Sequence, residues 1–68
     1  MARVRVVVYP LTAGGGRRVR ANGEILGRAR SLAELLEFLR RAGLDPDTVD
    51  LRDKERFEWR GGGPEIWE

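Results

Sequence analysis

The sequence contains no histidine and no cysteine, and Lys54 is its single lysine. These three residue types supply most of the acid-base, nucleophilic and metal-binding side chains that work near neutral pH. No histidine or second lysine is therefore present to activate the hydroxyl groups of the chain, which belong to Tyr9, Thr12, Ser31 and Thr48. We expect a protein that binds rather than catalyses, with no catalytic residue, no cofactor and no metal.

The lack of cysteine and histidine also removes the usual means of stabilising a very small domain. The chain has 68 residues, and a domain of this size buries only about 60% of its unfolded surface. Neither a disulfide nor a Cys/His zinc site can add stability. We expect one domain over residues 1–68, stabilised either by close packing of a monomer or by self-association as a homodimer.

Long apolar segments are missing as well. The longest apolar stretch, Val6 to Tyr9, is far too short to cross a bilayer. The first residues, Met1-Ala2-Arg3, lead directly into an alternating segment without the apolar region of a secretory signal. We therefore expect no membrane partner and a cytoplasmic location.

Positive charge is abundant but unevenly distributed. Twelve arginines and Lys54 stand against eleven acidic residues, for a net charge of +2. Residues 1–30 hold seven arginines and one acid, whereas residues 31–68 hold six basic and ten acidic residues. This asymmetry is typical of a basic face for an anionic partner, and equally of two halves that neutralise each other across one sheet. A GC-rich genome would also favour arginine over lysine. The composition alone therefore does not decide whether the arginines were selected to bind an anionic partner.

Alternating segments in the N-terminal half predict β-strands. Residues 3–9 alternate valine with other side chains, as in a strand with one buried face, and Pro10 is expected to end that strand. Residues 17–21 and 24–28 flank Asn22-Gly23. This dipeptide predicts a two-residue hairpin turn, because both central residues of a type I′ turn have positive φ. In that register Val19 and Leu26 share the core face.

One helix and one or two further strands complete the prediction. Residues 31–43 begin with the capping box Ser31-x-x-Glu34, repeat leucine at helical spacing and end at Gly43. Val49 and Leu51 suggest a short strand, and residues 56–60 alternate strictly. The expected fold is a single small two-layer α+β domain, with one helix packed on a mainly antiparallel sheet of four to five strands in β-ββ-α-ββ order.

This order superficially resembles the β-grasp or ubiquitin-like arrangement, and Gly61-Gly62 is similar to the diglycine tail of such modifiers. In those families the mature chain ends at the diglycine. Here residues 63–68 follow, so activation would first require processing. The resemblance assigns the chain to no family.

The first candidate site is a basic face on the expected sheet. Neighbouring strands lie about 4.8 Å apart, so outward arginines on adjacent strands would form a compact patch that can neutralise several phosphates. The patch lacks interleaved aromatic residues, which strand-borne RNA readers use for stacking. The alternative is a solvated face paired with Glu24, Glu58 or Asp50. The candidate nucleic-acid-binding residues are Arg3, Arg5, Arg17, Arg18, Arg20 and Arg28, with Arg30 at the rim.

The second candidate site is the aromatic C-terminal segment, with Trp59, Ile66 and Trp67 as candidate protein-binding residues. Tryptophan is enriched at binding hot spots, and the segment could add as a strand to a partner's sheet edge. Alternatively, it folds back and completes the core. The leading hypothesis is a non-enzymatic interaction or regulatory module that binds another protein or itself. Nucleic-acid binding through the basic face is the alternative.

The acidic run after the helix does not match a metal site. Calcium-binding loops have glycine at the sixth position and glutamate at the twelfth. Counted from Asp45, these positions hold Asp50 and Arg56, so no metal is expected there.

Overall fold

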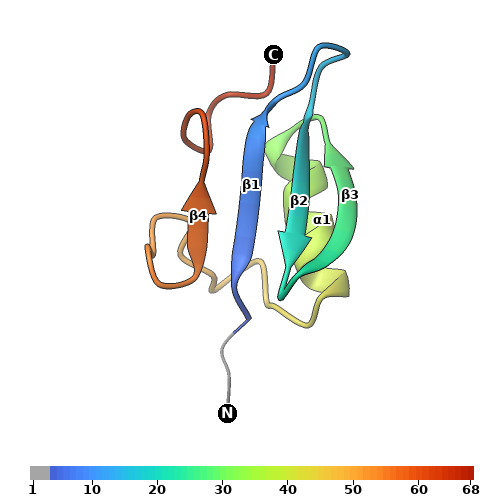
Figure 1. Ribbon diagram of the computed structural model, residues 1–68. Helices are drawn as coiled ribbons and strands as arrows, with labels where there is room; N and C mark the ends of the chain where they lie inside the picture. The colour runs from blue at the N-terminus through green and yellow to red at the C-terminus, as the bar shows by residue number, and fades with distance from the viewer. Residues whose placement is uncertain (1–3) are drawn as a thin grey trace.

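A sheet and one helix form the two layers of the protein. The computed structural model describes residues 4–68. In chain order the elements are β1 (Val6–Leu11), β2 (Arg17–Ala21), β3 (Glu24–Ala29), α1 (Leu32–Arg41) and β4 (Phe57–Trp59). The sheet order is β3-β2-β1-β4, in which β4 runs parallel to β1 and the other neighbours are antiparallel. Helix α1 crosses behind β2 and β3 (Figure 1). The predicted α+β fold with a mainly antiparallel sheet is confirmed.

The hairpin between β2 and β3 forms at the predicted turn. Asn22 has φ 52° and Gly23 has φ 82°, as a type I′ turn requires. The turn is also tied to the start of β1, because the Asn22 side-chain oxygen accepts from the Arg5 N–H at 2.8 Å. The Asn22 N–H in turn donates to the Arg5 carbonyl at 2.9 Å.

The predicted hairpin register holds only for the first pairs. Arg20 pairs with Ile25 as expected, but Val19 pairs with Gly27 rather than Leu26, so the register shifts by one residue. Gly27 has φ 138°, and a Cβ there would lie 3.1 Å from the Phe38 ring of α1. Glycine therefore allows both the bulge and the close approach of the helix.

The helix begins and ends where the sequence predicts. The Ser31 hydroxyl accepts from the Glu34 N–H at 3.2 Å, and the Glu34 carboxylate accepts from the Arg30 N–H at 2.7 Å. The first bond satisfies an orphan N–H group of the first turn, and the second ties the residue before the N-cap to the helix start. Leu35 and Leu39 are fully buried, and Gly43, with φ 92°, follows the last turn.

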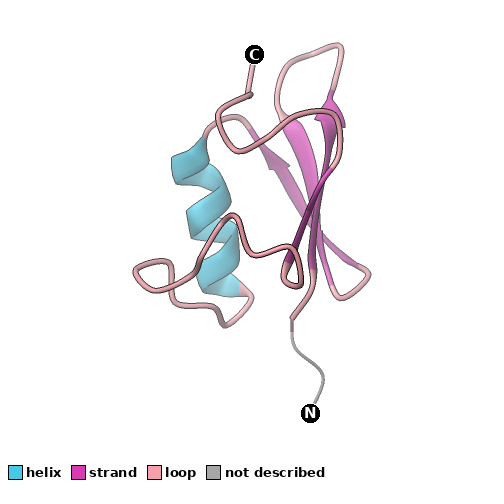
Figure 2. Cartoon of the chain, turned by 90° about the vertical axis from the view of Figure 1, so that its left-hand side faces the viewer, coloured by secondary structure: helices cyan, strands magenta, loops and turns pink. Residues whose placement is uncertain are grey.

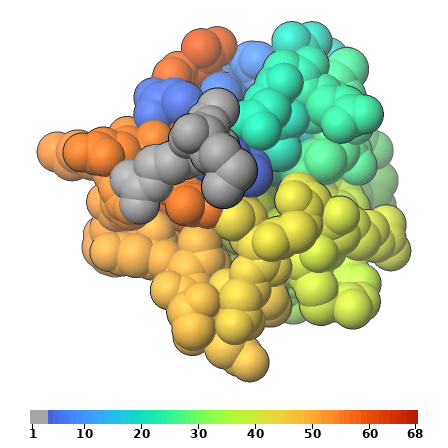
Figure 3. All heavy atoms as spheres, turned by 90° about the horizontal axis from the view of Figure 1, so that it is seen from below, coloured from blue at the N-terminus to red at the C-terminus, as the bar shows by residue number. Residues whose placement is uncertain are grey.

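The connection from α1 to β4, residues 44–56, contains turns but no strand, so the strand expected at Val49 and Leu51 is wrong. The acidic run explains the difference. Three aspartates each accept from a backbone N–H two residues further on, namely Asp45 from Asp47, Asp50 from Arg52 and Asp53 from Glu55. Such side-chain bonds favour turns over a strand ladder. Val49 and Leu51 still pack against the core. The connection that carries them, yellow to light orange at the bottom of Figure 3, lies away from the cyan strand β2 at the top of that view.

The core lies between the sheet and the helix. Alternate residues of the strands point into it, among them Val6, Val8 and Val19, which have no exposed surface. Strand β1 continues past Pro10 to Leu11, further than expected. The proline lies where the β1–β2 register shifts between Val8 and Leu11, and such an irregularity accommodates the missing N–H. In the view of Figure 2, α1 and the connection from α1 to β4 lie on one side of the sheet, and the other side is uncovered.

Candidate functional site

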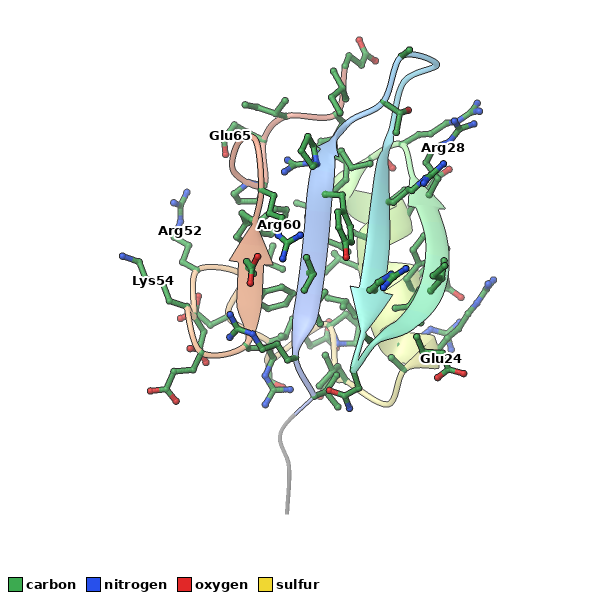
Figure 4. All side chains as sticks on the ribbon, viewed as in Figure 1. Glu24, Arg28, Arg52, Lys54, Arg60 and Glu65 are labelled. Carbon is green, nitrogen blue, oxygen red and sulfur yellow. The ribbon has the colours of Figure 1, made fainter. Side chains whose placement is uncertain are left out.

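The uncovered side of the sheet gathers basic side chains from β2 and β3, from the residue before β1 and from the residue after β4. Its residues alternate with the buried ones and are exposed or half-buried. Many of the sticks on the near side of the sheet in Figure 4 carry blue nitrogen ends. We call this surface the open face and define it by Arg5, Val7, Tyr9, Arg18, Arg20, Ile25, Arg28, Glu58 and Arg60.

Two arginines at the β4 side of the open face are held by neighbouring groups. Arg5 donates to the carbonyls of Lys54 at 3.2 Å and Glu55 at 2.8 Å, and it pairs with Glu58 at 3.4 Å. Arg60 also forms an ion pair with Glu58. The pKa of the Glu58 carboxyl is lowered, because Arg60 donates to it and Arg5 adds a second donor. This part of the open face is the internally paired surface that the sequence left as an alternative.

Three arginines near β2 and β3 have no such partner. Arg18 on β2 lies directly opposite Arg28 on β3, and Arg20 follows two residues after Arg18. All three are exposed. Among residues 4–68, no carboxylate forms an ion pair with any of them. Like charges directly opposite on a sheet repel each other, so this pair is a place where an anion would stabilise the protein.

The bulge at β3 creates this pairing. With the unshifted register, Arg18 would lie opposite Gly27, and Arg28 would point to the other side of the sheet. One extra residue reverses the alternation of β3, so that Ala29 is buried beside Arg17 while Arg28 joins the open face. The sequence places Arg28 among the candidate nucleic-acid-binding residues but gives no signal for this reversal.

Tyr9 lies at the centre of the open face between two guanidinium groups. The Arg60 guanidinium carbon is 5.0 Å from the ring centroid, and that of Arg20 is 5.9 Å. Both distances are within the range of cation–π attraction. The basic face therefore contains an aromatic ring, contrary to the expectation from the sequence. Its outward direction follows from the alternation of β1, but its contact with Arg60 depends on the parallel pairing of β1 with β4, which the sequence did not predict.

A hollow of about 270 Å³ adjoins the Tyr9 ring, lined by Tyr9, Thr12, Arg18, Arg20 and Ile25. Ile25 is 64% exposed, the highest value among the large hydrophobic side chains described. The hollow thus combines two apolar surfaces with two unpaired guanidinium groups.

Arg17 is not part of the basic face, although the sequence places it among the candidate nucleic-acid-binding residues. Its side chain is completely buried on the core side of β2. All five of its N–H donors are used, because they bind the carbonyls of Tyr9, Arg60, Gly62, Gly63 and Ile66 at 2.7 to 3.1 Å. The signal was present in the sequence: the alternation that places Val19 in the core places Arg17 beside it.

Two tryptophans enclose the Arg17 guanidinium. Its carbon lies 5.4 Å from the Trp59 ring and 5.6 Å from the Trp67 ring. Burial lowers the pKa of Arg17, and Glu65 acts in the opposite direction. The guanidinium stays charged, since its ordinary pKa lies far above neutral pH.

The candidate protein-binding residues are largely engaged within the domain. The Trp59 indole N–H donates to the Leu51 carbonyl at 2.8 Å, and that of Trp67 donates to the Pro64 carbonyl at 2.7 Å. Both rings pack against the core. Ile66 is 37% exposed, although its carbonyl binds Arg17. The segment therefore folds back, as the alternative for this site predicts. Arg3, another predicted basic residue, lies outside the described residues.

A comparison of the chain with protein-family models, with curated proteins and with solved structures finds no match. Within residues 4–68, no helix has the length and apolar character needed to cross a membrane. No group of three or more acidic side chains in that part of the chain is placed to hold a metal ion.

Proposed function

We propose that the protein is a non-enzymatic module that binds nucleic acid on its open face. The observation that carries this proposal is the cross-strand pair Arg18–Arg28, which has no carboxylate partner among residues 4–68. Arg20 adds a third unpaired guanidinium on the same face. Phosphate is the anion that arginine recognises with its forked donors, and a polyanion can engage several such groups at once.

The opposite side of the domain is less suited to this role. The exposed surface of α1 carries Glu37, which pairs with Arg40 at 2.5 Å and with Arg41 at 3.7 Å. With Glu34, α1 carries two acidic and two basic side chains, so it offers no excess of positive charge to a DNA groove. Arg18, Arg20 and Arg28 lie together on the sheet, and the sheet is where we place the ligand.

The test is a titration of fluorescently labelled, mixed-sequence DNA and RNA oligonucleotides at low and at physiological salt. We expect binding that weakens steeply with salt, because each neutralised phosphate releases a counterion. The double variant Arg18→Gln/Arg28→Gln should lower the slope of log K against log [salt] by roughly 1.4 on single strands, at about 0.7 per phosphate.

A matched control removes the same two charges elsewhere. Arg41→Gln/Arg52→Gln changes one exposed arginine on α1 and one on the connection between α1 and β4, both outside the open face. The lateral position of Arg52 is visible in Figure 4. We expect this control to keep the salt slope of the unmodified protein. Absence of binding at low salt, or equal losses in both double variants, would overturn the proposal.

A second candidate function, self-association, is favoured by the edge of the sheet. Strand β3 is the outermost strand on its side, and Ile25 on it is 64% exposed. Unpaired edge strands can pair with a second chain. Sedimentation of the protein with Ile25→Lys, compared with the unmodified chain, tests this: a dimer formed through β3 should dissociate, and an unchanged mass excludes that edge.

A further inference from the structure

The ligand of the open face can be specified further from the hollow beside Tyr9. This hollow lies across three strands, because Tyr9 is on β1, Arg18 and Arg20 are on β2 and Ile25 is on β3. Its apolar walls are the phenol ring and the exposed Ile25 side chain. Its polar walls are guanidinium groups without carboxylate partners among residues 4–68. A planar aromatic group next to a phosphate matches both kinds of wall, and a nucleotide has this composition.

The two arginines around Tyr9 are not equivalent. Arg60 is held in place by its ion pair with Glu58, so it supports one side of the ring at 5.0 Å. Among residues 4–68, Arg20 forms no ion pair, and its guanidinium contacts only the Tyr9 ring, at 5.9 Å. Its guanidinium plane can therefore shift to stack on an incoming base. Stacking on aromatic rings and on arginine is the usual way in which proteins hold unpaired bases.

The phosphates of such a ligand have a place next to the base. Arg18 lines the hollow, and Arg28 lies directly opposite it on β3. Arg28 also lies close to the glycine loop between β1 and β2, since a Cβ on Gly14 would be 3.5 Å from its guanidinium nitrogen. A phosphate between Arg18 and Arg28 would relieve their mutual repulsion.

We propose that the open face binds single-stranded nucleic acid, with one unpaired base in the hollow beside Tyr9 and an adjacent phosphate on Arg18 and Arg28. This inference rests on the proposed function and adds the state of the strand. Bases in a duplex are stacked on one another and paired, so none of them can enter the hollow. Any unstacked base presents a flat aromatic face, so the site is tolerant of sequence.

The experiment compares four labelled ligands of one length on the unmodified protein: a DNA strand of mixed sequence, the RNA strand of the same sequence, the DNA duplex, and an abasic DNA strand. The abasic strand keeps the phosphates and lacks the bases. We expect the affinity of the DNA and RNA strands to be at least roughly tenfold higher than that of the abasic strand. A factor of this size is the effect of a single stacking contact. The duplex should bind no better than the abasic strand.

Variants of Tyr9 and Arg18 separate the two parts of the site. Tyr9→Leu should weaken binding of the normal strands roughly tenfold and leave the abasic strand unchanged, whereas Tyr9→Phe, which keeps the ring, should bind like the unmodified protein. Arg18→Gln should weaken normal and abasic strands by the same factor. The tryptophan fluorescence of Trp59 and Trp67 reports whether each variant is folded.

The outcomes distinguish this inference from the proposal on which it rests. If the duplex or the abasic strand binds as tightly as the normal strands, the base site is refuted while nucleic-acid binding stands. If no ligand binds at low salt, both fail. If Tyr9→Leu does not fold, the comparison of normal with abasic strands on the unmodified protein still tests whether a base contributes to binding. A difference between the DNA and RNA strands identifies which of the two the hollow prefers.

Discussion

Replacing Arg17 with leucine is expected to destabilise the domain severely, although the residue is an arginine in an arginine-rich strand. Its guanidinium binds five backbone carbonyls, four of which belong to residues 60–66. The fifth belongs to Tyr9 on β1. The side chain therefore joins β1, β2 and the C-terminal segment, and leucine can replace its volume but none of its donors.

The magnitude follows from the bonds that would be lost. A hydrogen bond from a charged group contributes about 1.5 to 3 kcal/mol, but five bonds to one group are not additive. Removing one side of a buried charged network typically costs about 3 to 5 kcal/mol. The whole free energy of unfolding of a domain of this length is about 3 to 10 kcal/mol. Arg17→Leu should therefore leave a large fraction of the protein unfolded in water.

Urea unfolding followed by the fluorescence of Trp59 and Trp67 measures the change directly, since both rings lie beside the guanidinium. Measurements at two protein concentrations separate any contribution from a dimer. Arg18→Leu is the matched control, because it removes the neighbouring arginine from the exposed face opposite Arg28. We expect that control to stay within about 0.5 kcal/mol of the unmodified protein. A loss below about 1 kcal/mol for Arg17→Leu, or equal losses for both variants, would refute the reasoning.

Three further predictions concern a carboxylate, a glycine and pH. Glu58→Gln removes the only acid paired on the open face among the described residues, so single-stranded nucleic acid should bind more tightly, most clearly at low salt in the same titration. Gly62→Ala should lower the free energy of unfolding in urea by roughly 1 to 3 kcal/mol, because φ is 126° there and the new Cβ would lie 2.5 Å from Ile66. Gly14→Ala is its control, since the new Cβ there meets only an ordinary contact at 3.5 Å. The pKa of Glu58 is lowered in the folded state, so its stabilising effect is complete above its ordinary value of 4.5 and is lost as pH falls below it. The urea midpoint should then be level from about pH 6 to 7, where no side chain of this chain has its ordinary pKa, and fall in acid.

Most of the fold follows from local signals in the sequence. The turn at Asn22-Gly23, the cap at Ser31 and the end of the helix at Gly43 each depend on a single residue whose conformation or hydrogen bond is known in advance. Phe57 is buried and Glu58 is turned outward, as their alternation predicts. These elements need no information about distant parts of the chain.

The errors arise where distant segments decide the outcome. The bulge at Leu26 depends on the approach of Phe38 to Gly27, which is a tertiary contact. The missing strand at Val49 and Leu51 reflects competition from aspartate side chains that bind the backbone locally. The parallel pairing of β1 with β4 joins residues about fifty positions apart, so the neighbours of Tyr9 could not be foreseen.

The candidate site shows the same division. Alternation predicted that Arg5, Arg18 and Arg20 face away from the core, and the structure confirms their exposure. The alternation did not reveal which arginines are already bound to carbonyl or carboxylate groups of the protein itself. Arg5 is used by two carbonyls and Glu58, and Arg17 is used by five carbonyls, because the chain returns from residue 60 onward to cover it.

The distinction between bound and unbound arginines can be measured as a salt slope. The sequence alone nominates six arginines, and if each neutralised one phosphate of a single strand, at about 0.7 per phosphate, the slope of log K against log [salt] would be about −4. In the described residues only Arg18, Arg20 and Arg28 of this set lack both a carboxylate and a carbonyl partner. Three contacts give a slope of about −2. A slope near −3.5, for five contacts, would mean that Arg3 and Arg5 also reach the ligand, and that the contacts of Arg5 with Lys54, Glu55 and Glu58 give way on binding. A slope near −2 would place the phosphates at β2 and β3, beside the hollow in which we place the base.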